Sequence, residues 1–512
     1  MTSTVSISPA PLLPSDVVAV ARDGAPVVLS DEAMSALVKA RAVIDELAAS
    51  GEPVYGVSTG FGALATRYID PELRSQLQRS LVRSHAAGSG DEVEREVVRA
   101  LMLLRLHTLA TGHTGVHPET AQVYAAMLNA GITPVVREYG SLGCSGDLAP
   151  LSHCALAVMG EGEVRDGEGV LRPAGEALAA AGITPRQLST KEGLALINGT
   201  DGMLGQLLLA CHDLQLLVRH ADLSAAMSVE ALLGTDAVFA ADLQALRPHP
   251  GQALSAANLV RLLTGSAIME SHRVDCSTVQ DAYSLRCAPQ VAGAVRDTLT
   301  HAELVASREL ASAIDNPVVL DDGRVQSNGN FHGAPVGYVL DFLAIAAADL
   351  ASMSERRTDR MLDVARSHGL PAFLAYDPGV DSGHMIAQYT QAALVSELKR
   401  LAAPASVDSI PSSAMQEDHV AMGWSAARKL RRSVDALTRV LAIEILSAAR
   451  ALDFRAPLAP AAATAAVVAV LREHVAGPGP DRWLSPEIEA AVALVRGGSL
   501  LAAAESVTGP LA

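Results

Sequence analysis

The segment from Gly140 to His153 contains the residues of this 512-residue chain that are best suited to chemistry. Its glycines recur at every third position between small or polar side chains, and it leads into a predicted helix. One interpretation is purely structural: a glycine-rich turn in which Asp147 caps the helix and Pro150 occupies the first turn. Spacing alone does not decide between this turn and a reactive segment.

A phosphate-binding loop is set aside here, because no Lys follows Gly146 and the glycine spacing fits neither common phosphate-loop pattern. A thiol nucleophile is an alternative. Cys144 lies just ahead of the predicted helix, whose dipole would lower a thiol pKa, and His153 is a candidate base. The members of a catalytic pair are generally more distant in sequence than these two residues.

The third possibility is a reaction of the backbone in Cys144-Ser145-Gly146. In a tight turn the Gly146 nitrogen attacks the Cys144 carbonyl carbon, and loss of water closes a five-membered ring. Loss of the Ser145 hydroxyl as a second water leaves an exocyclic methylene, a strong electrophile made without an external cofactor. This chemistry requires Gly in third place and Ser in the middle, and it uses mainly the backbone of the first residue.

Other segments combine titratable or aromatic side chains with turn residues, which are costly to bury without partners. Aromatic residues make up only 3% of the chain, so those beside glycines stand out. A solvated loop would explain any one segment, but together with the glycine-rich segment they indicate a composite active site. They are Pro53–Gly62 with Tyr55, Arg83–Gly88 with His85, Lys191–Gly202 with Asn198, Gln280–Gln290 with Tyr283 and Arg286, Asn328–Gly333 with Phe331, and Ser412–His419 with Glu417.

These segments, in this order and over nearly the whole chain, resemble the aromatic amino acid ammonia-lyase family. In that family an Ala-Ser-Gly tripeptide becomes the 4-methylidene-imidazole-5-one group, MIO. Cys144 stands where Ala is commonest, a departure that affects the ring little because this position contributes mainly backbone atoms. The resemblance implies that Cys144, Ser145 and Gly146 form MIO and that no external cofactor is needed.

The resemblance also implies a role for each remaining candidate, and it is greatest to the members that act on histidine. Those roles are Tyr55 as base, Tyr283 as a proton relay, Asn198 beside MIO and the substrate amine, Arg286 on the carboxylate, Phe331 lining the site, and His85 with Glu417 on the imidazole. A carboxylate beside a His suits a ring with one N–H donor and one acceptor. The implied reaction converts L-histidine to trans-urocanate and ammonia; a phenylalanine or tyrosine ammonia-lyase, a 2,3-aminomutase and a catalytically silent scaffold remain alternatives.

The elements that must position these groups are long helices. Hydrophobic residues make up 49% of the chain, and apolar periodicity predicts helices over Ala294–Ala313, Val336–Ser367, His384–Ala403 and Glu417–Leu452. We expect a mainly α fold with a long-helix bundle and a smaller mixed N-terminal region, divided into 1–200, 201–455 and 456–512. The resemblance implies the ammonia-lyase/fumarase-like type and a homotetramer whose active sites are shared between subunits.

Charge and cysteine usage exclude several classes of protein. The net charge of −17 argues against nucleic acid or an anionic membrane as a partner. Five cysteines without a CxxC pair are typical of a reducing cytosol, and we see no targeting segment or membrane span, so we expect a cytoplasmic protein. Gly112 and Gly115 interrupt the helix that would make His113 and His117 metal ligands, so no metal site is expected.

Overall fold

The computed structural model describes residues 3–50, 56, 58–60, 67–274 and 278–512. The chain forms two compact units, each built from three segments. Unit 1 comprises Met1–Ala210, Ala302–Asp341 and Pro404–Arg428, and unit 2 comprises Cys211–His301, Phe342–Ala403 and Lys429–Ala512. The segments expected from the sequence follow chain order, whereas each unit joins parts that are distant in sequence.

Unit 1 combines medium-length helices with four small sheets. Its helices are α1 (Pro14–Arg22), α2 (Asp31–Ser50), α3 (Arg74–His85), α4 (Arg95–Ala110), α5 (Pro118–Asn129), α6 (Leu148–Val158), α7 (Ala174–Ala180) and α8 (Glu192–Ala195). One sheet is parallel and pairs β1 (Val5–Ile7) with β2 (Val27–Leu29). The other three sheets are antiparallel: β3 (Ser89–Glu92) pairs with β5 (Arg137–Tyr139), and β8 (Val318–Val319) pairs with β9 (Val325–Gln326). In the third, β6 (Glu163–Arg165) lies between β4 (Thr133–Pro134) and β7 (Leu171–Pro173) and pairs with both.

Helix α4 is the core helix of unit 1, and every residue from Val97 to Ala110 is buried. It packs against α1, α2, α5 and α6. Two arginines, Arg99 and Arg105, lie within this apolar helix and are among the largest fully buried side chains. Buried charges of this kind need partners, and both arginines donate to backbone carbonyls of other elements.

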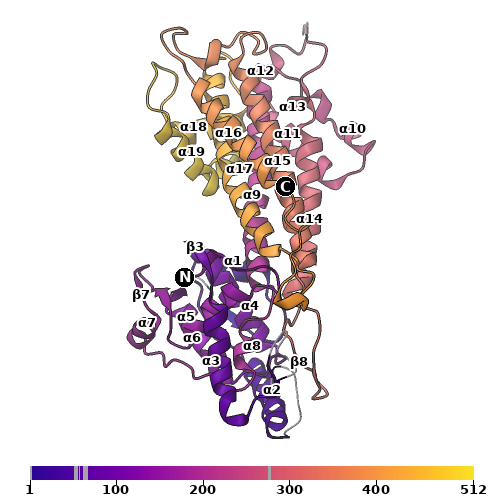
Figure 1. Ribbon diagram of the computed structural model, residues 1–512. Helices are drawn as coiled ribbons and strands as arrows, with labels where there is room; N and C mark the ends of the chain where they lie inside the picture. The colour runs from indigo at the N-terminus through magenta and orange to yellow at the C-terminus, as the bar shows by residue number, and fades with distance from the viewer. Residues whose placement is uncertain (1–2, 51–55, 57, 61–66, 275–277) are drawn as a thin grey trace. The chain divides into compact units, whose positions relative to one another are not determined.

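Four long helices each contribute residues to both units: α9 (Asp201–Ala231), α14 (Ala288–Leu310), α15 (Ala334–Leu362) and α17 (Gly423–Asp453). Unit 2 adds α10 (Ala241–Ala245), α11 (Pro250–Leu263), α12 (Ala267–Glu270), α13 (Tyr283–Arg286), α16 (Met385–Leu401), α18 (Ala462–Arg472), α19 (Ser485–Arg496) and α20 (Ser499–Thr508). The mainly α fold with long helices is confirmed (Figure 1).

Polar side chains connect the long helices inside unit 2. Glu444 of α17 accepts hydrogen bonds from Ser228 of α9 at 2.7 Å and from Arg357 of α15. Gln391 of α16 donates to the Val440 carbonyl of α17 at 2.9 Å. Hydrogen bonds between buried groups favour one arrangement of otherwise similar apolar faces.

Helix α15 is long and apolar enough to cross a membrane by length and composition, but 61% of its most apolar window is buried inside the protein. A buried core helix can have the same length and apolar composition as a membrane-spanning helix.

The predicted start of the last long helix at Glu417 is wrong, because α17 begins at Gly423. Ser413, Ala414 and Met415 have positive φ angles of 49°, 54° and 71°, which no helix continues through. The Ser412 amide closes this turn on the Glu417 carbonyl at 2.9 Å. Glu417 therefore lies on a loop, and its side chain reaches a cavity.

Candidate active site

Unit 1 contains a cavity of about 720 Å³ that brings together several of the predicted residues. His85 of α3, Cys144 and Ser145 of the glycine-rich turn, Asn198, and Glu417 all line it. Much of the remaining surface is apolar and comes from Ile69, Leu77, Leu81, Leu148, Leu194 and Ile197. An apolar cavity with a few converging polar groups is the usual form of a small-molecule site.

The glycine-rich turn is bent tightly at the predicted reactive residues. Ser145 has a φ of 51°, which is sparsely populated for a residue other than glycine, and Gly146 has a φ of 80°. A Cβ atom on Gly146 would overlap the Gly199 carbonyl oxygen, so only glycine fits. Gly199 donates its amide to the Ser145 carbonyl at 3.1 Å and accepts from the Asp147 amide at 2.8 Å. The turn is thus held on both sides of Gly146 in a strained conformation.

Asp147 occupies the N-cap position of α6, but its side chain makes no capping bond within the described chain. The carboxylate instead accepts from the Met203 amide at 2.8 Å and the Ser141 hydroxyl at 3.0 Å. Complete burial raises the pKa of Asp147 to about 7. Asp147 was expected only to cap a helix, and the sequence carries no signal of this burial, since Met203 is distant in the chain.

Cys144 does not have the environment of a thiolate nucleophile. Burial, and then the charge of Glu417, raise the pKa of its thiol, the opposite of the expected effect of a helix N-terminus. The candidate base His153 accepts from the Gly88 amide through Nε2 at 3.1 Å. Burial, and then Arg137, lower the pKa of His153. The geometry therefore favours backbone chemistry over thiol catalysis.

His85 and Glu417 present acceptors to the cavity. His85 Nδ1 lies 2.9 Å from the Leu81 carbonyl, which can only accept, so Nδ1 carries the proton and Nε2 is the acceptor. Burial lowers the pKa of His85 and keeps the ring neutral. Glu417 Oε2 is buried and has no hydrogen-bond partner among the described residues. A ligand ring with an N–H group would satisfy one of these acceptors.

Asn198 is fixed by its amide nitrogen, which donates to the Leu194 carbonyl at 3.2 Å and the Asn316 carbonyl at 3.0 Å. This orientation leaves its side-chain oxygen as an acceptor. Arg67 also lines the cavity, a cation that the sequence did not single out because a lone Arg beside a glycine-rich loop has no distinctive pattern.

The remaining predicted residues lie elsewhere or outside the described residues. Tyr55 is outside them. Phe331, in unit 1, is not among the described residues that line the cavity. Tyr283 and Arg286 belong to α13 of unit 2, where the guanidinium lies 4.6 Å from the centre of the tyrosine ring and Tyr283 is 70% exposed.

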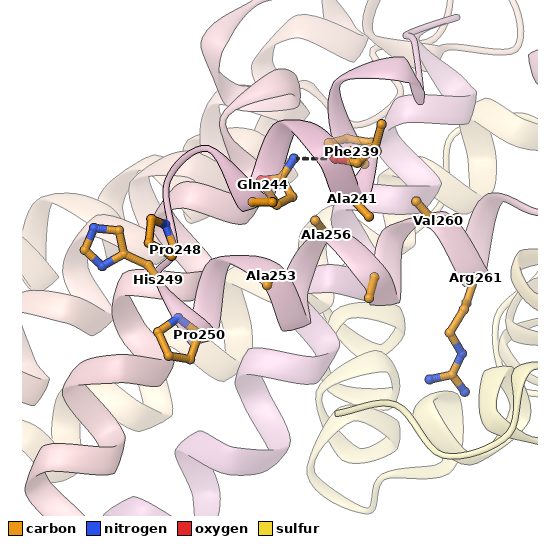
Figure 2. A pocket seen from close by; sticks show the side chains of 13 residues that line it. Phe239, Ala241, Gln244, Pro248, His249, Pro250, Ala253, Ala256, Val260 and Arg261 are labelled. Carbon is orange, nitrogen blue, oxygen red and sulfur yellow. Dashed lines mark hydrogen bonds between the residues drawn. The ribbon is translucent and has the colours of Figure 1, made fainter.

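A second cavity, of about 650 Å³, lies in unit 2 beside α10 and α11. Figure 2 shows Pro248, His249 and Pro250 around one part of it and Arg261 at another. Its described lining contains no carboxylate, thiol or hydroxyl group, and none of the predicted site residues. Among the residues with described positions, no group of three or more His, Cys, Asp or Glu is placed to hold a metal ion.

Comparisons with known proteins show the family of this chain. The profile of the aromatic amino acid lyase family matches residues 12–473. The histidine ammonia-lyase of Streptomyces avermitilis is 68% identical over 510 residues, which cover 99% of this chain and 100% of that protein. The tyrosine aminomutase of Streptomyces globisporus superposes with a TM-score of 0.93 at 37% identity, covering 99% of this chain and 100% of that one. The histidine ammonia-lyase of Trypanosoma cruzi superposes with a TM-score of 0.90 at 38% identity, covering 98% and 95%.

Proposed function

Since the chain belongs to the aromatic amino acid lyase family, we propose that it eliminates ammonia from L-histidine to give trans-urocanate, the first step of histidine degradation. The observation that carries this proposal is Glu417 Oε2, which is buried without a hydrogen-bond partner among the described residues, in the cavity that His85 and Ser145 also line. Relatives at 68% identity that bear the name histidine ammonia-lyase support it.

We propose that Cys144, Ser145 and Gly146 mature into MIO. The residues fit this group, because the turn is already bent at Ser145 and only a residue without Cβ fits at Gly146. MIO supplies an electrophile that activates the substrate for loss of ammonia. No metal or external cofactor enters this proposal.

The chain's own residues bind and orient the substrate. The imidazole ring has one N–H, which donates to the Glu417 carboxylate or to His85 Nε2, and the apolar wall of the cavity covers the ring. A phenyl ring would leave both acceptors unpaired, and unpaired buried polar groups discriminate strongly between substrates. The Asn198 oxygen is placed to accept from the substrate amine.

The family resemblance supports the remaining roles. In the proposal Tyr55 removes the β-proton, Tyr283 relays it, Arg286 binds the carboxylate and Phe331 lines the site. A guanidinium binds a carboxylate with two parallel hydrogen bonds, which fixes the substrate's orientation. Tyr283 and Arg286 are neighbours on one short helix, so they would enter a site together.

We further propose a cytoplasmic homotetramer with active sites shared between subunits. Tyr338, Phe342 and Ile345 follow helical spacing on α15 and are 52%, 50% and 46% exposed, an apolar stripe that a neighbouring subunit would cover. The described cysteines Cys144, Cys154 and Cys287 are not joined in disulfides, as in a reducing compartment. If the sites are shared, dissociation into monomers abolishes activity, and a fully active monomer contradicts the proposal.

A 2,3-aminomutase is the second candidate, because a tyrosine aminomutase shares the fold over the whole chain. The purified protein should be incubated with L-histidine while near-ultraviolet absorbance follows urocanate, with intact mass taken on the same sample. We expect urocanate and a mass short by two waters. A mass deficit with a β-amino acid as product would support the aminomutase instead, and an unreduced mass would contradict MIO chemistry.

A further inference from the structure

Gly199 is confined between the reactive turn and a buried ion pair. On one side, a Cβ atom on Gly146 would overlap the carbonyl oxygen of Gly199. On the other side, a Cβ atom on Gly199 would overlap Nη2 of Arg105 and a carboxylate oxygen of Asp201. The turn, Gly199 and the Arg105–Asp201 pair are therefore stacked without free space.

The backbone of Gly199 determines where the turn can lie. Its amide donates to the Ser145 carbonyl at 3.1 Å, and its carbonyl accepts from the Asp147 amide at 2.8 Å. These two bonds hold the residues on either side of Gly146. A displacement of Gly199 would therefore displace the Gly146 nitrogen.

Arg105 is rigidly fixed behind Gly199. Its side chain is fully buried in α4 and forms an ion pair with Asp201, the first residue of α9. Nη1 donates to the Ala195 carbonyl at 3.0 Å and the Ile314 carbonyl at 3.4 Å. A planar guanidinium held by acceptors on three segments cannot move away from Gly199 without breaking these interactions.

We propose that the Arg105–Asp201 pair positions the reactive turn for ring closure, acting through Gly199. This inference rests on the proposed function. In the closure a bond forms between the Gly146 nitrogen and the Cys144 carbonyl carbon. The carbonyl oxygen leaves as water with the amide hydrogens of Gly146 and Ser145. The Ser145 hydroxyl leaves as the second water with the Ser145 α-hydrogen, and no oxidant or reductant is needed.

Arg105 is a positioning residue in this proposal, since it touches no reacting atom. Misplacing reacting groups by about 1 Å slows a reaction on the order of 100-fold, so the pair affects the rate of ring closure even when the fold is kept. A purely structural arginine would alter stability without this specific effect.

The same helix provides a matched control. Arg99 of α4 is also fully buried and donates to the Val20 carbonyl at 3.0 Å and the Leu128 carbonyl at 3.1 Å. None of these partners belongs to the reactive turn or to Gly199. Loss of Arg99 therefore reproduces the loss of a buried arginine without loosening the support of Gly199.

The test compares the full-length wild type with Arg105→Met, Arg105→Lys, Arg99→Met and Arg99→Lys. Intact mass at intervals after rapid purification gives the rate at which each chain loses two waters, and thermal unfolding gives its stability. We expect ring closure in Arg105→Met to be slower on the order of 100-fold. Arg105→Lys, which keeps the charge beside Asp201, should fold and close at an intermediate rate, and both Arg99 variants should close at the wild-type rate.

Wild-type ring closure in folded Arg105→Lys and Arg105→Met would overturn the inference while leaving the proposed function intact. Equal slowing in Arg99 and Arg105 variants of similar stability would also overturn it, since the effect would then follow stability alone. A wild-type chain that keeps both waters would contradict the proposed function itself, and the inference with it.

Discussion

Replacement of Glu417 by Gln tests how the cavity recognises the imidazole ring. Gln has the shape of Glu, but it lacks the charge of the carboxylate whose Oε2 is buried without a partner among the described residues. A hydrogen bond to a charged group contributes about 1.5–3 kcal/mol, and a loss of about 1.4 kcal/mol of binding free energy lowers the affinity about tenfold. We therefore expect Glu417→Gln to lower kcat/KM for L-histidine about 10- to 100-fold.

The assay is the initial rate of urocanate formation, with intact mass taken on each variant. Glu138→Gln is a matched control, because Glu138 is a buried carboxylate that is not among the described residues lining the cavity. Its Oε1 lies 3.8 Å from Arg428 Nε. We expect the control to keep its activity and both variants to lack two waters. Loss of the mass deficit in Glu417→Gln would instead place Glu417 in ring formation.

The pKa of the Cys144 thiol provides an independent check on the Glu417→Gln variant. Burial, and then the charge of Glu417, raise the pKa of the Cys144 thiol, so removal of the charge should lower that pKa. The pH dependence of thiol alkylation measures the change. A lowered thiol pKa with unchanged kcat/KM would show that Glu417 faces the cavity without binding the ring, and would refute the assignment.

Three further predictions concern Cys144, Asp147 and His384. Cys144→Ala should keep both the mass deficit and activity, because ring closure uses backbone atoms; loss of activity with the ring intact would restore the thiol mechanism. Burial raises the pKa of Asp147 to about 7, so its ionisation destabilises the folded state as pH rises from about 4 to 7. Asp147→Asn should therefore gain thermal stability relative to wild type across that range, and a constant difference would contradict this. Burial lowers the pKa of His384 to about 3, so stability is lost as pH falls from about 6.5 towards 3. The melting temperature of His384→Gln should fall less than that of wild type between pH 7 and 5, and an equal fall would show that His384 is not kept neutral.

The sequence was informative where function depends on residue type. Ser145 and Gly146 could be proposed as ring-forming residues because ring closure needs a hydroxyl and a residue without a side chain at those positions. The long helices could be predicted because apolar periodicity over many residues is a local property. Helix ends were less certain, as the start of α17 shows: Ser413, Ala414 and Met415 turn the chain with positive φ angles, although none of them is a glycine.

The sequence was least informative where a residue's role depends on a distant partner. Asp147 looks like an ordinary helix cap, and the burial that raises its pKa is a property of the folded chain. The sequence does show Arg105 within an apolar segment. Because the helix formed by this segment is buried on all sides, the guanidinium must find acceptors in other elements. The sequence could not show that one of these partners is Asp201, or that Gly199 lies against the pair.

Two glycines show why a reactive turn can be recognised from sequence more easily than its support. Gly146 is required by the chemistry and would be glycine in any protein that makes this ring. Gly199 is required because the fold gives it a φ of 155° and because Arg105 and Asp201 occupy the space where its Cβ would lie. The first requirement is local and therefore visible in a motif, whereas the second arises when α4, α9 and the turn pack together. In our proposal ring closure thus depends on the completed fold of unit 1, and we expect a chain that contains the motif without this packing to form an ordinary turn.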